Sequence, residues 1–167
     1  MTEPSAQPMT GPDLASVTAQ LGRAPRAAHA VAHRCPCGHP DVVVTTPRLP
    51  DGTPFPTLYY LTCPRAVGAV STLESAGLMR QMNARLAVDG ELAARYRAAH
   101  ERYLSTREQM GHVQEIAGIS AGGMPDRVKC LHVQVAQALA EGPGVNPFGD
   151  ETLARISPWW IDGPCVP

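Results

Sequence analysis

Alternating or continuous β-branched residues mark three segments in the first half of the chain. Alanines alternate with larger residues over residues 28–33, and residues 42–46 are β-branched throughout. A third segment, residues 57–62, is rich in Thr, Leu and Tyr. Such segments are typical of β-strands. Because Pro and Gly mark turns at 36–40 and 50–54, the three segments predict an antiparallel meander.

A short helix is predicted before these strands. Residues 14–21 have apolar positions on one helical face, Asp13 is suited to cap this helix, and Gly22 is suited to end it. Residues 1–12 are rich in Pro, Ser and Thr and offer little to bury, so we expect a disordered tail there. Residues 13–167 would then form a single domain.

The apolar period changes to that of an α-helix after the third strand. Ser71 and Glu74 have capping-box spacing, and apolar residues recur on one helical face as far as Leu86. After Gly90, a second apolar stripe extends over residues 92–110. We expect an antiparallel helical hairpin that covers the sheet.

A third helix is predicted near the C-terminus. Its first turn would be Met124-Pro125-Asp126, because proline is favoured there, and it would continue to about Ala140. Residues 145–167 are rich in Pro and Gly and predict an irregular tail with one short helix at 150–156. The expected fold class is α+β, a three-stranded antiparallel meander packed on a helical hairpin plus a C-terminal helix and irregular tail.

Composition and charge exclude several classes of protein. The 167 residues include 15 Gly and 17 Pro, which indicates many loops. The net charge of −1 supplies no basic surface for nucleic acid, and no apolar run is long enough to span a membrane. The first 12 residues also lack the apolar core of a signal peptide. We therefore expect a cytoplasmic protein that binds neither nucleic acid nor membrane.

The cysteines suggest a metal site. Their number is five, which is odd, and in a chain without an export signal this argues against a disulfide framework. Zinc takes four nitrogen or sulfur ligands, commonly as close pairs from separate segments. Such pairs occur in the turn Cys-Pro-Cys-Gly-His at 35–39 and in the segment Lys-Cys-Leu-His at 129–132. The candidate metal ligands are Cys35, Cys37, Cys63, Cys130 and His132.

The ligand set remains open at this point. Cys130 and His132 point about 200° apart on an ideal helix, so both can face one metal only if the first turn is irregular. The preferred set is Cys35, Cys63, one of Cys130 and His132, and either Cys37 or His39. One alternative is that the thiols are small buried residues and His132 a hydrogen-bonded core residue. Another is a thiol nucleophile at Cys130 or Cys63.

A glycine-rich loop suggests an anion site. Gly122 and Gly123 precede the predicted C-terminal helix, whose backbone N–H groups and dipole would suit phosphate. The candidate anion-binding residues are Arg48, Arg65, Gly122, Gly123, Arg127 and Lys129. Their expected ligand is a phosphorylated small molecule. The alternative is a tight connection beside solvated Arg and Lys side chains.

Several longer motifs carry a resemblance to a known family. They include CPCG at 35–38, TPRL at 46–49, DGTPFPTLYYLTCP at 51–64, AGGMPDRVKCLH at 121–132 and GPGVNP at 142–147. With them the chain resembles, over about residues 14–151, an uncharacterised bacterial family, domain-of-unknown-function family 501. The family commonly has a second histidine five residues after the one that matches His132, and this chain has Gln137 there.

The resemblance also implies possible partners. Members of the family are often encoded beside an exopolyphosphatase or guanosine-pentaphosphatase homologue and a small septum-formation coiled-coil protein. This context adds polyphosphate to the expected ligands. The leading hypothesis is a protein with a Cys/His-lined, zinc-like site that binds a phosphorylated small molecule. The alternative is a non-enzymatic protein whose helical hairpin docks on a cell-division or polyphosphate-metabolism partner.

Overall fold

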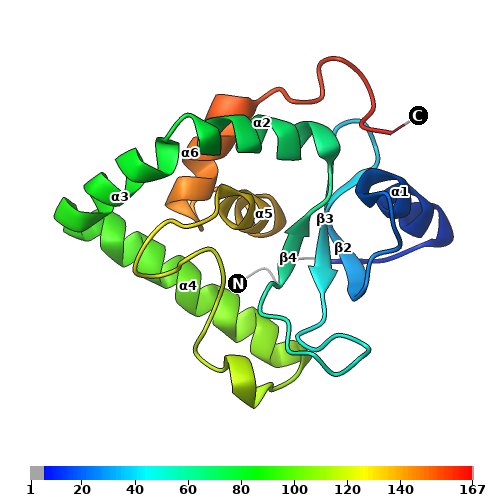
Figure 1. Ribbon diagram of the computed structural model, residues 1–167, viewed down its shortest axis with the longest axis horizontal. Helices are drawn as coiled ribbons and strands as arrows, with labels where there is room; N and C mark the ends of the chain where they lie inside the picture. Colours follow the sequence, from blue (N-terminus) through cyan, green and yellow to red (C-terminus); the bar gives the residue numbers. More distant parts are fainter. Residues whose placement is uncertain (1–5, 167) are drawn as a thin grey trace.

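A four-stranded antiparallel sheet organises the protein, and the computed structural model describes residues 6–166 of it (Figure 1). The strand order is β1-β2-β3-β4, with β1 at Gln7–Pro8, β2 at Ala28–Arg34, β3 at Pro40–Thr45 and β4 at Tyr59–Leu61. The three predicted strands are confirmed as an antiparallel meander. The fourth, β1, was missed because it lies in the segment predicted to be disordered; residues 1–5 of that segment lie outside the described residues.

Alternation along β3 turns its side chains toward two separate layers. Val43 pairs with Val31 of β2 and Tyr60 of β4. Val42 and Val44 belong to the main hydrophobic core with residues of the later helices. Helix α1, at Gly11–Leu21, contacts β3 as well. It starts earlier than predicted because Thr10, not Asp13, is its N-cap, and Asp13 is the reciprocal partner in a capping box.

The first helix of the predicted hairpin is divided into two. Helix α2 spans Pro64–Ser75 and α3 spans Leu78–Val88, and they are separated at Gly77, whose φ of 89° is left-handed. The predicted capping box at Ser71 and Glu74 was wrong, because both residues lie inside α2. Helix α4, at Gly90–Met110, follows as predicted and contacts α3.

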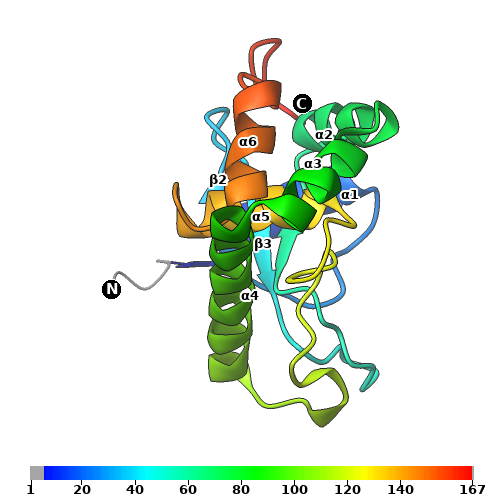
Figure 2. The same ribbon diagram turned by 90° about the vertical axis from the view of Figure 1, so that its left-hand side faces the viewer.

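The C-terminal helix, rather than the hairpin, packs most closely on the sheet. Helix α5 spans Leu131–Glu141 and contacts β4, β2 and β3 on one side and α2 and α6 on the other. Helix α6 spans Pro147–Ile156. Figure 1 shows α5 in the middle of the helical layer, and Figure 2 shows α4 upright with α6 above it. A short 3-10 helix, Gln114–Ile116, follows α4.

The predicted start of the C-terminal helix was wrong by several residues. The backbone N–H groups of Arg127 and Lys129 bond the carbonyls of Gly123 and Gly122 at 3.1 and 2.8 Å, so this segment is a compact turn. Cys130, with φ −148° and ψ 115°, is extended and serves as the N-cap of α5. The helix therefore starts at Leu131, and Cys130 lies outside it.

Buried amides join the three helices α4, α5 and α6. Asn146 donates to the side-chain oxygens of Gln134 and Gln137 at 2.8 and 2.9 Å, and Gln137 donates to the carbonyl of Ala99. Gln137 is fully buried. Its side chain thus belongs to the core of the molecule. In the described residues, no helix is both long enough and apolar enough to cross a bilayer.

Candidate metal centre

A carboxylate, a thiol and an imidazole meet where α2 passes the start of α5. Cys130 Sγ lies 3.9 Å from His132 Nδ1, which in turn lies 3.2 Å from Glu74 Oε1. One ligand atom from each of the three residues lies within 4.8 Å of the other two. Cys130 and His132 can approach each other because Cys130 is extended. The irregular first turn that both ligands require is therefore present.

Contacts with neighbouring groups hold Glu74 and His132 in place. Glu74 Oε2 accepts a hydrogen bond from the backbone N–H of Leu131 at 2.9 Å, which satisfies one of the free donors at the start of α5. Oε1 remains directed at His132. The other ring nitrogen of His132, Nε2, lies 3.4 Å from the carbonyl of Val67 and 3.3 Å from Ser71 Oγ. Helix α2 thus positions both Glu74 and the imidazole.

The electrostatics of the pair favour a proton on the imidazole. Burial raises the pKa of the Cys130 thiol, but hydrogen bonds from His132 and the backbone of Val133 outweigh it, so this pKa lies below its ordinary value. The Cys130 hydrogen bond raises the pKa of His132 against the effect of burial, and the charge of Glu74 raises it further. The cluster can therefore supply a thiolate to a cation, and the imidazole can bind the same cation once it has released its proton.

An open groove of about 580 Å³ adjoins the cluster. Its lining residues come from α1, β4, α2 and the start of α5, and they include Cys130 and His132. Leu21 and Tyr60 line this groove and also a smaller hollow of about 160 Å³. The two hollows therefore adjoin.

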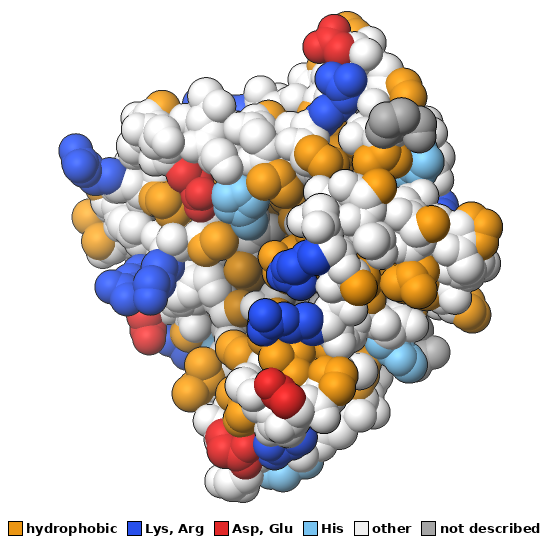
Figure 3. All heavy atoms as spheres, turned by 45° about the vertical axis from the view of Figure 1, so that its right-hand side comes forward, with side chains coloured by type: hydrophobic (Ala, Val, Ile, Leu, Met, Phe, Trp, Pro, Cys, Tyr) orange, Lys and Arg blue, Asp and Glu red, His pale blue; other side chains and the backbone are white. Residues whose placement is uncertain are grey.

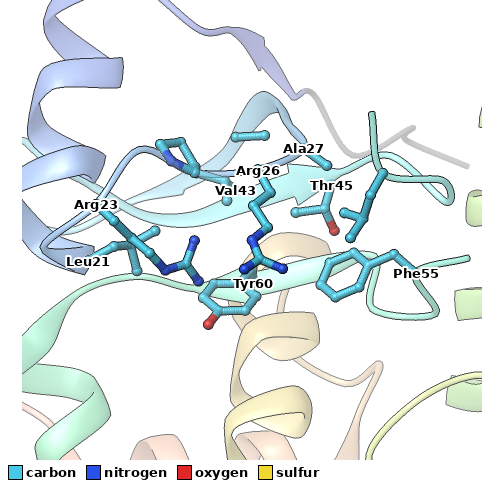
Figure 4. Close-up of a pocket in the computed structure, with 11 residues that line it drawn as sticks. Leu21, Arg23, Arg26, Ala27, Val43, Thr45, Phe55 and Tyr60 are labelled. Carbon is cyan, nitrogen blue, oxygen red and sulfur yellow. The ribbon is translucent and has the colours of Figure 1, made fainter. Parts of the chain in front are cut away.

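The smaller hollow combines an apolar surface with two arginines (Figure 4). Arg23 and Arg26 follow α1 and lie beside Phe55 and Tyr60. Figure 3 shows basic side chains next to hydrophobic ones near the middle of the face it presents. Sequence reasoning missed these arginines. Their place in a loop of unremarkable composition gave no local signal.

The predicted metal ligands separate into two groups. Cys130 and His132 join Glu74, which was not predicted as a ligand. Cys35 and Cys37 lie in the turn after β2, where the thiol of Cys37 is 3.6 Å from that of Cys165. His39, the predicted alternative, bonds Ser16 Oγ through Nδ1 at 2.9 Å. Metal binding by these residues stays a prediction.

Two of the predicted anion-binding arginines contact protein groups instead. Arg48 pairs with Glu115 at 2.9 Å, and Arg65 donates to the carbonyls of Asp162 and Pro164 in the tail. No helix starts at Gly122 and Gly123. A Cβ at Gly123 would lie 2.6 Å from the carbonyl oxygen of Arg127. Tight packing therefore explains why this position is a glycine. Arg127 and Lys129 belong to the same turn, and phosphate binding there stays a prediction.

Comparisons with known proteins give a family. No curated protein and no solved structure matches the chain. One family model, described as a protein of unknown function (DUF501), matches residues 31–154, which is most of the chain. The resemblance carried by the sequence motifs is thereby confirmed, and the chain belongs to the DUF501 family.

Proposed function

We propose that this protein binds a zinc-like metal ion through Glu74, Cys130 and His132 and uses it on a small anionic ligand in the adjoining groove. The observation that carries the proposal is the approach of three different ligand types to within 4.8 Å of one another. A tetrahedral zinc site with bonds of about 2.0–2.3 Å places its ligand atoms about 3.3–3.8 Å apart. The observed 3.2 and 3.9 Å separations lie close to this range.

The surroundings of the imidazole also suit a metal ligand. A histidine that binds metal through one ring nitrogen commonly donates its other N–H to a carbonyl or carboxylate. With the metal on Nδ1, the N–H at Nε2 would face the carbonyl of Val67, 3.4 Å away. Glu74 is likewise oriented by its bond to Leu131. These contacts favour a preorganised site.

Three protein ligands would leave one position for water or a ligand, as in catalytic zinc sites. Because Cys130 and His132 line the groove, that position would be reached from it. The metal would lower the pKa of a bound water or polarise a bound oxygen. Arg23 and Arg26, in the adjoining hollow, supply positive charge for an anionic group on the same ligand. A phosphorylated small molecule fits this description.

The test is the metal content of the purified full-length protein, compared with that of His132→Ala. We expect His132→Ala to lose about one metal per chain. His112→Ala is the matched control, because His112 is exposed and contacts Glu108 and Gln114 instead. Equal metal content in all three proteins would overturn the proposal. Thermal shift with inorganic pyrophosphate, repeated on an Arg23→Ala, Arg26→Ala double variant, tests the anion-binding part.

A second candidate function is catalysis by a thiol nucleophile at Cys130. It is supported by the contact between this thiol and the imidazole of His132. Cys130 Sγ and His132 Nδ1 are 3.9 Å apart beside the groove, an arrangement that activated thiols use. In the metal-free protein this function predicts that iodoacetamide modifies Cys130 faster than the other cysteines, and that His132→Ala slows the modification. Peptide mass spectrometry measures both rates. Uniform rates would exclude this function.

The alternative of a helical docking surface stays a prediction. The large exposed hydrophobic residues of the described chain are Leu14, Val88, Ile119 and Ile161. Only Val88 lies at the junction of α3 and α4. Since they do not form one patch on these helices, the groove supports a function better than the helical surface does.

A further inference from the structure

Four of the five cysteines converge on the side of the molecule where the C-terminal tail is docked. They come from three segments: Cys35 and Cys37 from the turn between β2 and β3, Cys63 from the N-cap of α2, and Cys165 from the tail. Cys37 Sγ lies 3.6 Å from Cys165 Sγ. All are free thiols. Segments distant in the sequence thus bring Cys37 and Cys165 into contact.

Neighbouring thiols affect one another's pKa values. Burial raises the pKa of Cys35 to about 11, and its neighbours Cys37 and Asp41 add smaller effects. Burial likewise raises the pKa of Cys165, where Cys63 and Cys37 also act. The pKa of Cys63 is raised by burial first and by Cys35 to a lesser extent. The charge state of each of these three thiols is therefore sensitive to at least one of the other cysteines.

N–H groups are directed at these sulfurs. The backbone N–H of Cys37 lies 3.5 Å from Cys35 Sγ, and Gln20 Nε2 donates to Cys165 Sγ at 3.2 Å. The backbone N–H groups of Ala66 and Arg65, at the start of α2, oppose the rise in the pKa of Cys63. Donors of this kind stabilise a negatively charged sulfur, and a metal-bound thiolate is such a sulfur.

We propose that Cys35, Cys37, Cys63 and Cys165 bind one zinc ion in a structural four-thiolate site that fastens the C-terminal tail. A tetrahedron with Zn–S bonds of about 2.3 Å separates its sulfurs by about 3.8 Å, close to the 3.6 Å between Cys37 and Cys165. Binding releases the thiol protons to solvent. This site is independent of the Glu74 cluster.

The four sulfurs are less tightly grouped than the Glu74 cluster. In the part of the chain that the structure describes, the only group of three ligand atoms all within 4.8 Å of one another is that of Glu74, Cys130 and His132. Zinc would therefore draw the sulfurs closer together. The tail can accommodate this, because Cys165 follows Gly163 and Pro164 and the segment is outside helices and strands. Arg65 already holds this tail through the carbonyls of Asp162 and Pro164.

The experiment compares zinc content of the full chain with that of Cys165→Ser and Cys37→Ser, purified under reducing conditions. Both residues are half-buried, so the variants should fold. We expect each to lose about one zinc per chain. His112→Ala, which belongs to neither site, is the matched control and should keep all of its zinc. His132→Ala should lose only the zinc of the Glu74 centre. Unchanged zinc in Cys165→Ser overturns the proposal, whereas a loss confined to His132→Ala supports only the Glu74 centre.

Cobalt gives a second readout that separates the two sites. Four thiolates give cobalt(II) an intense sulfur-to-metal charge-transfer absorption, and a site with a single thiolate gives much less. The cobalt-loaded full chain should show this band, and Cys165→Ser should lose most of it while His132→Ala keeps it. If the protein instead purifies without zinc and with a Cys37–Cys165 disulfide in its peptide map, the four-thiolate site is refuted in favour of a redox bridge.

Discussion

One residue of α2, Glu74, has two different partners at the start of α5. The carboxylate of Glu74 divides its two oxygens between the backbone N–H of Leu131 and the imidazole of His132. One oxygen thus supports the start of α5, and the other would bind the proposed metal. A substitution that keeps the hydrogen bond to Leu131 and removes the negative charge can separate the two roles.

The substitution Glu74→Gln makes this separation. Its amide oxygen can still accept the hydrogen bond from Leu131, so we expect the free energy of unfolding of the metal-free protein to change by less than about 1 kcal/mol. Loss of the anionic ligand should weaken zinc binding by at least about tenfold. Competition with a chromogenic chelator measures the affinity. Glu108→Gln, on the exposed end of α4, is the control, and an equal affinity in Glu74→Gln would contradict the assignment.

The stability of the metal-free protein should depend on pH through His132. Its pKa is raised in the folded state above the ordinary value of 6.5, chiefly by its hydrogen bond with Cys130. The folded protein therefore binds this proton more tightly than the unfolded chain does. The resulting stabilisation is fully present below about pH 6.5 and disappears as the pH rises through the folded pKa.

Urea unfolding of the chelator-treated protein between pH 5.5 and about pH 8.5 checks this dependence. In His132→Gln, the free energy of unfolding should no longer fall as the pH rises through the folded pKa of His132. Zinc should bind more weakly as the pH falls, because protons compete for the imidazole and the thiolate. A variant that keeps the pH dependence of the original protein would show that another group titrates.

Two of the proposed ligands could not be found from local sequence. Glu74 has capping-box spacing from Ser71, and only the packing of α2 against α5 brings it to His132. Cys165 lies in an irregular tail, far in sequence from Cys37, so no spacing motif connects them. Cys35, Cys37 and Cys130 could be singled out because close pairs of Cys and His are visible within a few residues. Tertiary packing, not local pattern, sorted them into two groups.

At the scale of elements, the prediction succeeded where local and global preferences agree. The β-branched run at 42–46 forms β3, which is buried throughout, because it suits both the strand conformation and the core. The start of α5 was missed because Pro125 has the local signature of a first helical turn. Backbone hydrogen bonds between Gly122 and Lys129 override that preference.

The close crossing of α5 and α6 gives a test of packing at this scale. A Cβ at Gly149 would lie 2.2 Å from the carbonyl oxygen of Gln134, which belongs to the backbone and cannot turn aside. We expect Gly149→Ala to destabilise the protein by about 3 kcal/mol, measured by urea unfolding. Gly68→Ala in α2 is the control, because nothing lies near its Cβ, and it should stabilise by about 0.5–1 kcal/mol. Similar changes in the free energy of unfolding for Gly149→Ala and Gly68→Ala would contradict the close crossing of α5 and α6.

For the whole molecule, α2 connects the two proposed metal sites. Cys63 is its N-cap, and Glu74 lies in its last turn. The four-thiolate site would fix one end of the helix and the tail, and the Glu74 centre would join the other end to α5. Because both sites hold segments that are distant in the sequence, metal binding should be coupled to the folding of the entire chain.

Removal of zinc should therefore lower the thermal unfolding midpoint of the whole protein. A ligand present at about 1,000 times its Kd stabilises the folded state by about 4 kcal/mol, and in a chain of this size that corresponds to a shift of about 10 °C. Differential scanning calorimetry with and without chelator measures it. His132→Ala and Cys165→Ser should each show a smaller shift than the original protein, and the double variant none. If the double variant responds to chelator as the original protein does, then neither site is coupled to folding.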